Sequence, residues 1–192
     1  MLGAQETGVT AVPPPAPRSV RDPRLARLLS DHFQFIWRYV RRLGVPDPDD
    51  ATQQVFIILA NKLEGVEPDR ERAFLAATAV RVAANARRLR DRRREQASDS
   101  ALAESPHPGP TPEELVDHKR KRELLDAVLD ILPLPLRTVF VLYEMEGMST
   151  AEIARMLDIP MGTAASRLRR ARELFQGEVA RLRERGESGG KS

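Results

Sequence analysis

The chain contains no cysteine and only three histidines among its 192 residues. Without cysteine it cannot form a disulfide, a thiolate zinc site or a cysteine nucleophile. The histidines, at positions 32, 107 and 118, are too scattered for a metal-binding or general-base cluster, and no glycine-rich loop is present that would hold a phosphate. These absences argue against an enzyme, and we expect no catalytic residues, no metal and no cofactor.

Long apolar runs are also missing. No segment approaches the roughly 20 apolar residues needed to span a bilayer, and the N-terminus "MLGAQETGVTAVPPPAPR" lacks the apolar stretch of a secretory signal. We therefore expect a soluble cytoplasmic protein without membrane insertion.

Charged residues and prolines are distributed unevenly along the chain. The formal net charge is only +3, but the basic residues are clustered, so local charge matters more than the total. Two stretches rich in proline and small polar residues, "VPPPAP" and "EQASDSALAESPHPGP", have the composition of unfolded segments. The predicted division is a disordered Pro-rich tail (1–21), a helical domain (22–94), a flexible linker (95–110), a second helical domain (111–183) and a disordered tail (184–192).

The first domain is predicted to consist of helices that begin at Asp-Pro pairs. Aspartate is a good N-cap and proline suits the first turn, so helices should begin at 22–23 and 47–48 and end near Gly44 and Gly65. A longer helix is expected over 72–94. In the first helix, spacing predicts that Phe33, Ile36, Trp37 and Val40 face the core, whereas the orientation of Phe35 and Tyr39 is less strongly predicted. In the long helix, the residues predicted to face the core are Leu75, Thr78, Ala79, Val82, Ala86 and Leu89.

The second domain is predicted to be helical too. Capping boxes begin at Thr111 and Ser149, prolines 133 and 135 interrupt the helical pattern, and Gly147 ends the helix before the last capping box. The helices "TAEIARML" and "MGTAASRLRRARELF", joined by a short turn, form a helix-turn-helix. Because no alternating strand pattern occurs, we predict an all-α fold.

One edge of the long helix carries Arg81, Asn85, Arg88 and Arg92 at intervals of four, three and four. From 81 to 94 only Asp91 offsets the arginines, which favours contact with a polyanion over a merely solvated face.

The second helix of the helix-turn-helix is predicted to carry apolar and polar residues on different faces. The face expected to pack carries Ala164, Leu168, Ala171 and Phe175. A different face has donors suited to base edges and phosphates, on Thr163, Ser166, Arg167 and Arg170, and Arg169 and Arg172 lie beside it, in positions suited to backbone phosphates.

The stretch "LPLPLRTVFVLYEMEGMSTAEIARMLDIPMGTAASRLRRARELF" resembles the fourth conserved region of bacterial RNA polymerase sigma factors, particularly the extracytoplasmic-function (ECF) group. "DPDDATQQVFIILANKL" and "AFLAATAVRVAANARRLRDRRR" resemble that group's second region. The resemblance implies a factor that binds core RNA polymerase and promoter DNA and helps to open the duplex. It leaves open an anti-sigma factor as a further partner.

Roles follow from this resemblance position by position. It implies polymerase contacts at Asp50, Gln53, Gln54 and Val55, minus-ten contacts at Arg81, Asn85, Arg88 and Arg92, and minus-thirty-five contacts at Thr163, Ser166, Arg167, Arg169 and Arg170. The loop from Glu64 to Glu71 falls where the family can hold a flipped-out base.

Four positions depart from the family pattern: Gln54, Arg81, Asn85 and Ala165 stand where other residue types are common. We therefore expect an unusual promoter. The alternative is a helix-turn-helix regulator without a sigma role, which leaves the first domain unexplained.

Overall fold

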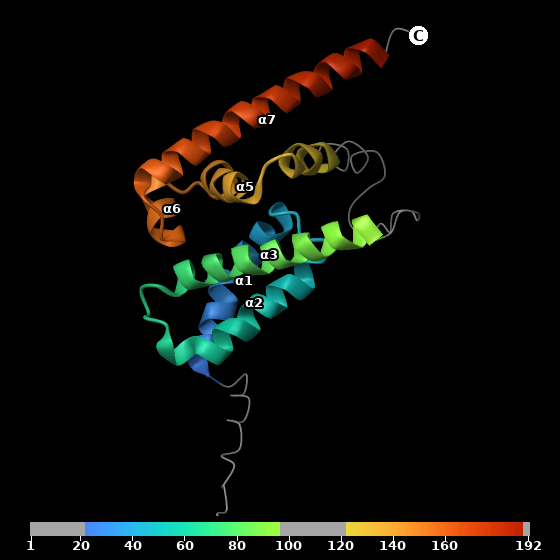
Figure 1. Ribbon diagram of the computed structural model, residues 1–192. Coiled ribbons are helices and arrows are strands. Elements are labelled where there is room, and N and C mark those ends of the chain that lie inside the picture. Colours follow the sequence, from blue (N-terminus) through green and yellow to red (C-terminus); the bar gives the residue numbers. More distant parts are fainter. Residues whose placement is uncertain (1–21, 97–121, 190–192) are drawn as a thin grey trace, which may run out of the picture.

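The structure, a computed structural model, describes residues 22–96 and 122–189 (Figure 1). All regular elements of these two stretches are helical, which confirms the all-α prediction. The N-terminal region (22–96) contains α1 (Pro23–Arg42), α2 (Pro48–Lys62), the 3-10 turn η1 (Leu63–Gly65) and α3 (Glu71–Gln96). The C-terminal region (122–189) contains a helical stretch over 122–130, α5 (Leu134–Phe140), the π-helical η2 (Val141–Met145), α6 (Thr150–Leu157) and α7 (Met161–Gly189).

Some predicted boundaries differ from the observed ones. Helix α3 continues to Gln96 and α7 to Gly189, beyond the ends expected for the two domains. The predicted tail over 1–21, the helix start at Thr111 and most of the predicted linker lie outside the described residues. In the two described stretches, no helix combines the length and the apolar character needed to cross a membrane.

The predicted Asp-Pro caps are present. An Oδ1 atom of Asp22 accepts a hydrogen bond from the backbone N–H of Arg24 at 2.8 Å, and Asp47 accepts one from the N–H of Asp50 at 3.0 Å. Each proline occupies the start of its helix, where its missing N–H costs nothing. Both helices therefore begin where the sequence indicated.

The predicted inward face of α1 is correct at Ile36 and Val40, which are fully buried, but wrong at Phe33. Phe35 and Tyr39 are buried, at 8% and 0% exposure, whereas Phe33 is 39% exposed. Trp37 is only partly buried, and its Nε1–H donates to Asp49 at 3.0 Å. Helix α1 packs against α2 and α3 and also meets η2 of the C-terminal region, so its buried stripe is wider than one neighbour would produce.

The predicted inward face of α3 is correct for most of its length. Leu75, Ala79 and Val82 are buried, but Leu89 is 53% exposed. The last described residue of α3 in the buried core is Ala83. Beyond it α3 is covered only in part: Ala86 is half-buried against the core and Arg87 donates to the carbonyl of Leu43 at 3.1 Å, whereas Leu89 faces solvent.

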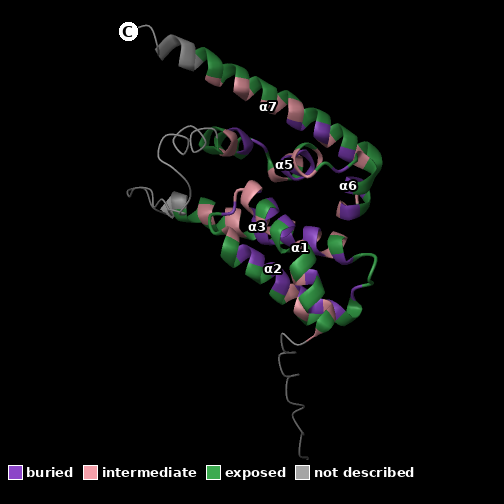
Figure 2. Cartoon of the chain, turned by 180° about the vertical axis from the view of Figure 1, so that it is seen from behind, coloured by how far each residue is buried: buried purple, intermediate pink, exposed green. Residues whose placement is uncertain are grey.

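The two regions pack directly against each other. Buried side chains from both form one hydrophobic cluster among the described residues, with α3 against α6 and α1 against η2. Along α7, in contrast, no described residue after Ala171 is buried (Figure 2). The sequence pattern predicts two helical domains but carries no sign of this contact between them.

Gly44 and Arg137 meet where the two regions join. Gly44 follows α1 with a φ of +82°, and a Cβ added there would lie 2.9 Å from an Nη atom of Arg137 and 3.0 Å from Oδ1 of Asp130. Arg137 is only 1% exposed, and it donates to the backbone carbonyl of Arg42 and to the carboxylate of Asp130. The missing side chain of Gly44 thus leaves room for a guanidinium from the other region.

Gly44→Ala is therefore expected to destabilise the protein more than Gly147→Ala. Gly147 also has a positive φ, +67°, but no atom lies within 4 Å of its would-be Cβ. Backbone strain alone should cost about 1–2 kcal/mol at either position, and crowding of Arg137 should add about 1–3 kcal/mol at Gly44. Urea unfolding of both variants measures the difference; equal losses would mean that Arg137 moves aside freely.

Candidate nucleic-acid interface

Helix α6 and the start of α7 form the predicted helix-turn-helix. Glu152 accepts hydrogen bonds from the Ser149 backbone N–H at 2.8 Å and from its hydroxyl at 2.7 Å, and the Ser149 oxygen accepts from the Glu152 N–H at 3.3 Å. Asp158 then adopts a left-handed conformation with φ +52°, and the N–H of Ile159 donates to the carbonyl of Ala154 at 3.0 Å. This capping box and tight turn fix the start of α7 relative to α6.

Helix α7 packs by the face that the sequence predicted. Ala164, Leu168 and Ala171 are buried, and the Phe175 ring stacks on Phe140 of α5 with centroids 4.8 Å apart. Since these contacts fix the rotation of α7 about its axis, they determine which of its polar residues face solvent.

The predicted minus-thirty-five residues lie together near the start of α7. Ser166, Arg169 and Arg170 are exposed, and Thr163 and Arg167 are partly buried. The Ser166 hydroxyl donates to the carbonyl of Thr163 at 3.1 Å, which leaves its lone pairs to accept. Arg170 pairs with Glu173 at 3.0 Å on the helix surface, an exposed ion pair that a phosphate or base edge can displace at little cost.

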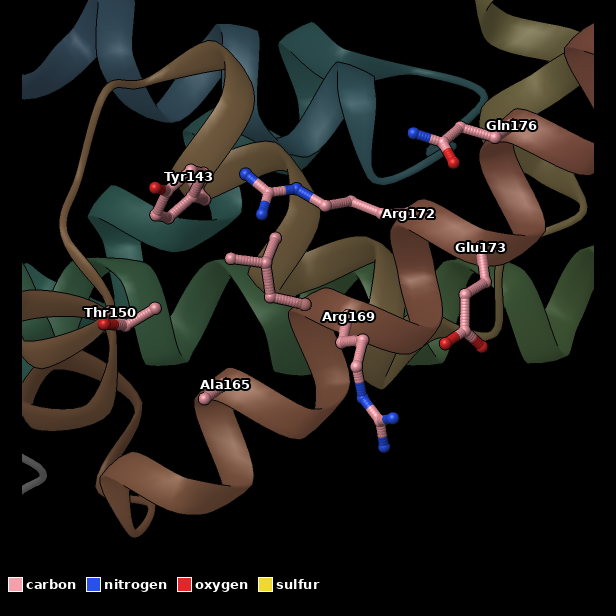
Figure 3. Close-up of a pocket in the computed structure, with 8 residues that line it drawn as sticks. Tyr143, Thr150, Ala165, Arg169, Arg172, Glu173 and Gln176 are labelled. Carbon is pink, nitrogen blue, oxygen red and sulfur yellow. The ribbon is translucent and has the colours of Figure 1, made fainter.

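Arg172 does not share this exposed surface. It donates to Glu144 of η2 at 2.7 Å, and its guanidinium lies 4.8 Å from the centre of the Tyr143 ring. Figure 3 shows Arg172 directed towards Tyr143 while Arg169 points away from it. These residues line a pocket of about 480 Å³. In this structure Arg172 joins α7 to η2, so the predicted phosphate contact would require its ion pair with Glu144 to break.

The arginine edge of α3 is exposed as predicted. Arg81, Asn85, Arg88 and Arg92 all lie on the protein surface. Arg81 also lines a groove of about 1290 Å³ that α3 and the preceding loop share with α6, where Glu152, Arg155 and Met156 contribute to the wall.

The loop from Glu64 to Glu71 is anchored by a residue that the sequence analysis missed. Arg24 of α1 donates to the carboxylate of Glu71 at 2.6 Å, to the carbonyl of Leu63 at 3.1 Å and to that of Val66. Glu71 is only 6% exposed, and breaking such a buried pair is costly. One guanidinium therefore holds both ends of the loop, which also lines the groove.

The residues predicted to contact a protein partner differ in how far they are exposed to solvent. Asp50, Gln53 and Gln54 are exposed on α2, whereas Val55 is fully buried. Val55 therefore holds α2 in place and offers no contact surface in this structure. Ile57 was not among the predicted contact residues, but it is 53% exposed and lies one turn beyond Gln53. The signal was available, because Ile57 falls outside the stripe of Ala51, Val55, Ile58 and Leu59.

A helix-turn-helix with exposed donors, and a second helical region with its own exposed arginine edge, define a DNA-binding protein of the transcription-factor class. Residues 122–175 match the family model described as "Sigma-70, region 4". The chain is 30% identical over 177 residues to the ECF RNA polymerase sigma-E factor of Haemophilus influenzae, with 84% of this chain and 90% of that protein covered. It is 32% identical to that of Escherichia coli K12, over 76% of this chain and 78% of that protein. The chain belongs to the ECF family of RNA polymerase sigma factors, which are transcription initiation factors.

Further comparisons agree on the fold. The chain is 29% identical over 161 residues to the ECF sigma factor SigE of Mycolicibacterium smegmatis, and spans 63% of that protein's length. CnrH, solved in complex with the cytosolic domain of CnrY, matches with a TM-score of 0.60 at 22% identity, over 81% of this chain and 87% of CnrH. The sigma factor RpoE of Bartonella quintana, solved with the anti-sigma factor NepR, matches with a TM-score of 0.59 at 21% identity. This match covers 82% of this chain and 97% of RpoE.

The capping box provides a test of how α6 is held. The hydrogen bond from the Ser149 hydroxyl, followed by that from its backbone N–H, lowers the pKa of the Glu152 carboxyl. Because the folded pKa is the lower one, this contribution to stability is present above the unfolded pKa and is lost as pH falls through the folded value. Ser149→Ala should raise the pKa of Glu152, measured by NMR titration of its carboxyl carbon. Thr150→Ala, which leaves the box intact, is the control; an unchanged pKa in Ser149→Ala would contradict the assignment.

Proposed function

We propose that this chain binds core RNA polymerase, directs it to a specific set of promoters and helps to open the DNA there. The observation that carries the proposal is the rotation of α7: with Leu168 and Ala171 buried, the residues left at the surface near its start are donors for DNA. A helix-turn-helix presents such residues to the major groove. The protein performs no chemical step itself and acts in the cytoplasm, where the bacterial polymerase works.

In the proposed division of labour, the C-terminal region contacts the minus-thirty-five element and the N-terminal region contacts polymerase and the minus-ten element. Arginine and serine side chains at the start of α7 suit base edges and phosphates. The edge of α3, exposed and short of acids, suits a DNA backbone. The loop held by Arg24 lies beside the groove, in a position to receive an unstacked base, whose extrusion costs on the order of a few kcal/mol.

Polymerase is proposed to bind α2. Asp50, Gln53 and Gln54 supply a polar rim, and the exposed Ile57 and Phe33 supply apolar surface of the kind that interface centres use. An anti-sigma factor is proposed as a further partner, because the similar RpoE was solved with one.

Run-off transcription tests the function as a whole. Purified core polymerase plus the protein should initiate at discrete sites on fragments of the source genome, and mapping those sites gives the promoter. If the protein does not associate with core polymerase, it is not a sigma factor, and a regulator that uses only the helix-turn-helix becomes the better account.

Arg167→Ala and Arg170→Ala are each expected to reduce promoter-directed transcription roughly tenfold to a hundredfold, the value of a good base contact. Polymerase binding should be unchanged in both. Arg181→Ala, an exposed arginine further along the same helix, is the matched control and should have little effect. Loss of polymerase binding in either test variant would mean that the C-terminal region has been misassigned.

Asp50→Ala combined with Gln53→Ala should weaken polymerase binding roughly tenfold, the loss expected on truncating interface residues. The free energy of unfolding should fall by no more than about 1 kcal/mol, the value of a carboxylate in the first turn of a helix. Asp31→Ala, on the exposed side of α1, serves as the control. Binding is measured by titrating labelled protein with core polymerase. Equal affinities for the double variant and the control would move the polymerase site away from α2.

A further inference from the structure

The loop from Glu64 to Glu71 carries an excess of negative charge. Its side chains include the carboxylates of Glu64, Glu67, Asp69 and Glu71, and a single guanidinium, that of Arg70. All of these charged residues except Glu71 line the groove beside α3. A DNA strand that enters the groove brings further negative charge, which repels a segment that lies largely between helices. The loop therefore keeps its shape beside DNA only if other parts of the protein hold it.

Arg24 of α1 holds both ends of this loop at once. Its Nε atom donates to a carboxylate oxygen of Glu71 at 2.6 Å. Its two terminal nitrogens donate to the carbonyl of Leu63, at 3.1 Å, and to that of Val66. The two carbonyls lie at the first end of the loop and the carboxylate lies at the other. Because the guanidinium is planar and rigid, it fixes the separation of the two ends.

The contacts of Arg24 are built into the free protein. Asp22 caps α1 and accepts a hydrogen bond from the backbone N–H of Arg24 at 2.8 Å, which fixes the helical turn that carries this side chain. Leu63, Val66 and Glu71 are all buried. Since a buried carboxylate is costly to leave without its partner, the loop is already tied to α1 before any DNA binds.

Arg27, one turn further along α1, provides a comparison for Arg24. Its guanidinium also approaches the carboxylate of Glu71, at 3.6 Å, but its side chain is 60% exposed, compared with 28% for Arg24. In the part of the chain that the structure describes, Arg27 pairs with the loop through this carboxylate and not through the two carbonyls. Both arginines therefore place positive charge beside Glu71, whereas Arg24 also joins the two ends of the loop.

We propose that Arg24 is a positioning residue for DNA opening, because it presets the loop as one wall of the site that receives the unstacked base. The inference rests on the proposed function, of which base capture by this loop is one part. Extruding a base is unfavourable, and a loop that is already ordered loses little conformational entropy when it captures one. Arg24 therefore acts on the opening step and not on the earlier binding to duplex DNA.

Arg24→Lys tests the proposal, because lysine keeps the positive charge but cannot contact three acceptors through a planar fork. The matched control is Arg27→Lys, which makes the same exchange on the same helix beside the same carboxylate. Glu71→Gln is a second test variant, which removes the ion pair with little change of shape. Urea unfolding establishes that each variant is folded. Each is then combined with core polymerase on the promoter mapped by run-off transcription, with 2-aminopurine in the minus-ten element to report unstacking.

Arg24→Lys is expected to slow the rise of 2-aminopurine fluorescence roughly tenfold, a loss typical of loosened site geometry, and Glu71→Gln should slow it less. The affinity of the closed complex for duplex DNA should be unchanged in both, and Arg27→Lys should match the parent in both measurements. Amide hydrogen exchange of residues 64–71 in the free protein should be faster in Arg24→Lys, which shows that the loop itself has loosened.

Equal opening rates for Arg24→Lys and Arg27→Lys would overturn the proposal. So would a loss in Arg24→Lys that appears entirely in the affinity of the closed complex, because a residue that acts on base capture leaves that affinity intact. If the parent protein opens no promoter, the proposed function is overturned instead. Hydrogen exchange then decides separately whether Arg24 orders the loop, and unchanged exchange in Arg24→Lys would overturn that part as well.

Discussion

The buried guanidinium of Arg137 is the group on which the arrangement of the two regions depends. A charge at 1% exposure needs acceptors, and one of those it uses is the carbonyl of Arg42 at the end of α1. That carbonyl is reachable because Gly44 has no Cβ and turns the chain away with a positive φ. Asp130, from its own region, balances the charge. The end of α1, the glycine after it and the first turns of α5 therefore form one unit.

Local chemistry made much of the fold predictable from sequence. The Asp-Pro caps and the Ser149 capping box act within four residues, so their patterns predict helix starts directly, and the rotation of α7 follows from the spacing of Ala164, Leu168 and Ala171. The failures involve partners distant in sequence. Phe35 and Tyr39 are buried because helices pack on more than one side of α1, and the roles of Arg24 and Arg137 depend on carbonyls tens of residues away. Periodicity carries no information about such contacts.

Arginine serves three different purposes in this chain, and burial separates them. Arg24 and Arg137 satisfy main-chain carbonyls and hold segments in place. Arg172 joins α7 to η2 through Glu144 and the face of Tyr143. Arg88 and Arg169 are exposed and are of the kind that we propose for DNA contact. A count of basic residues in the sequence does not separate these roles. In the structure, the guanidinium groups of Arg24, Arg137 and Arg172 are engaged in contacts within the protein.

The contacts that join the two regions lie within a single chain, so even weak contacts between them are favoured. Tethered partners meet at an effective concentration on the order of millimolar, so an association that would be negligible between separate molecules can dominate here. Because both partners belong to one chain, dilution does not weaken the contact between the regions. Only a ligand that binds another arrangement of the regions better than this one would change it.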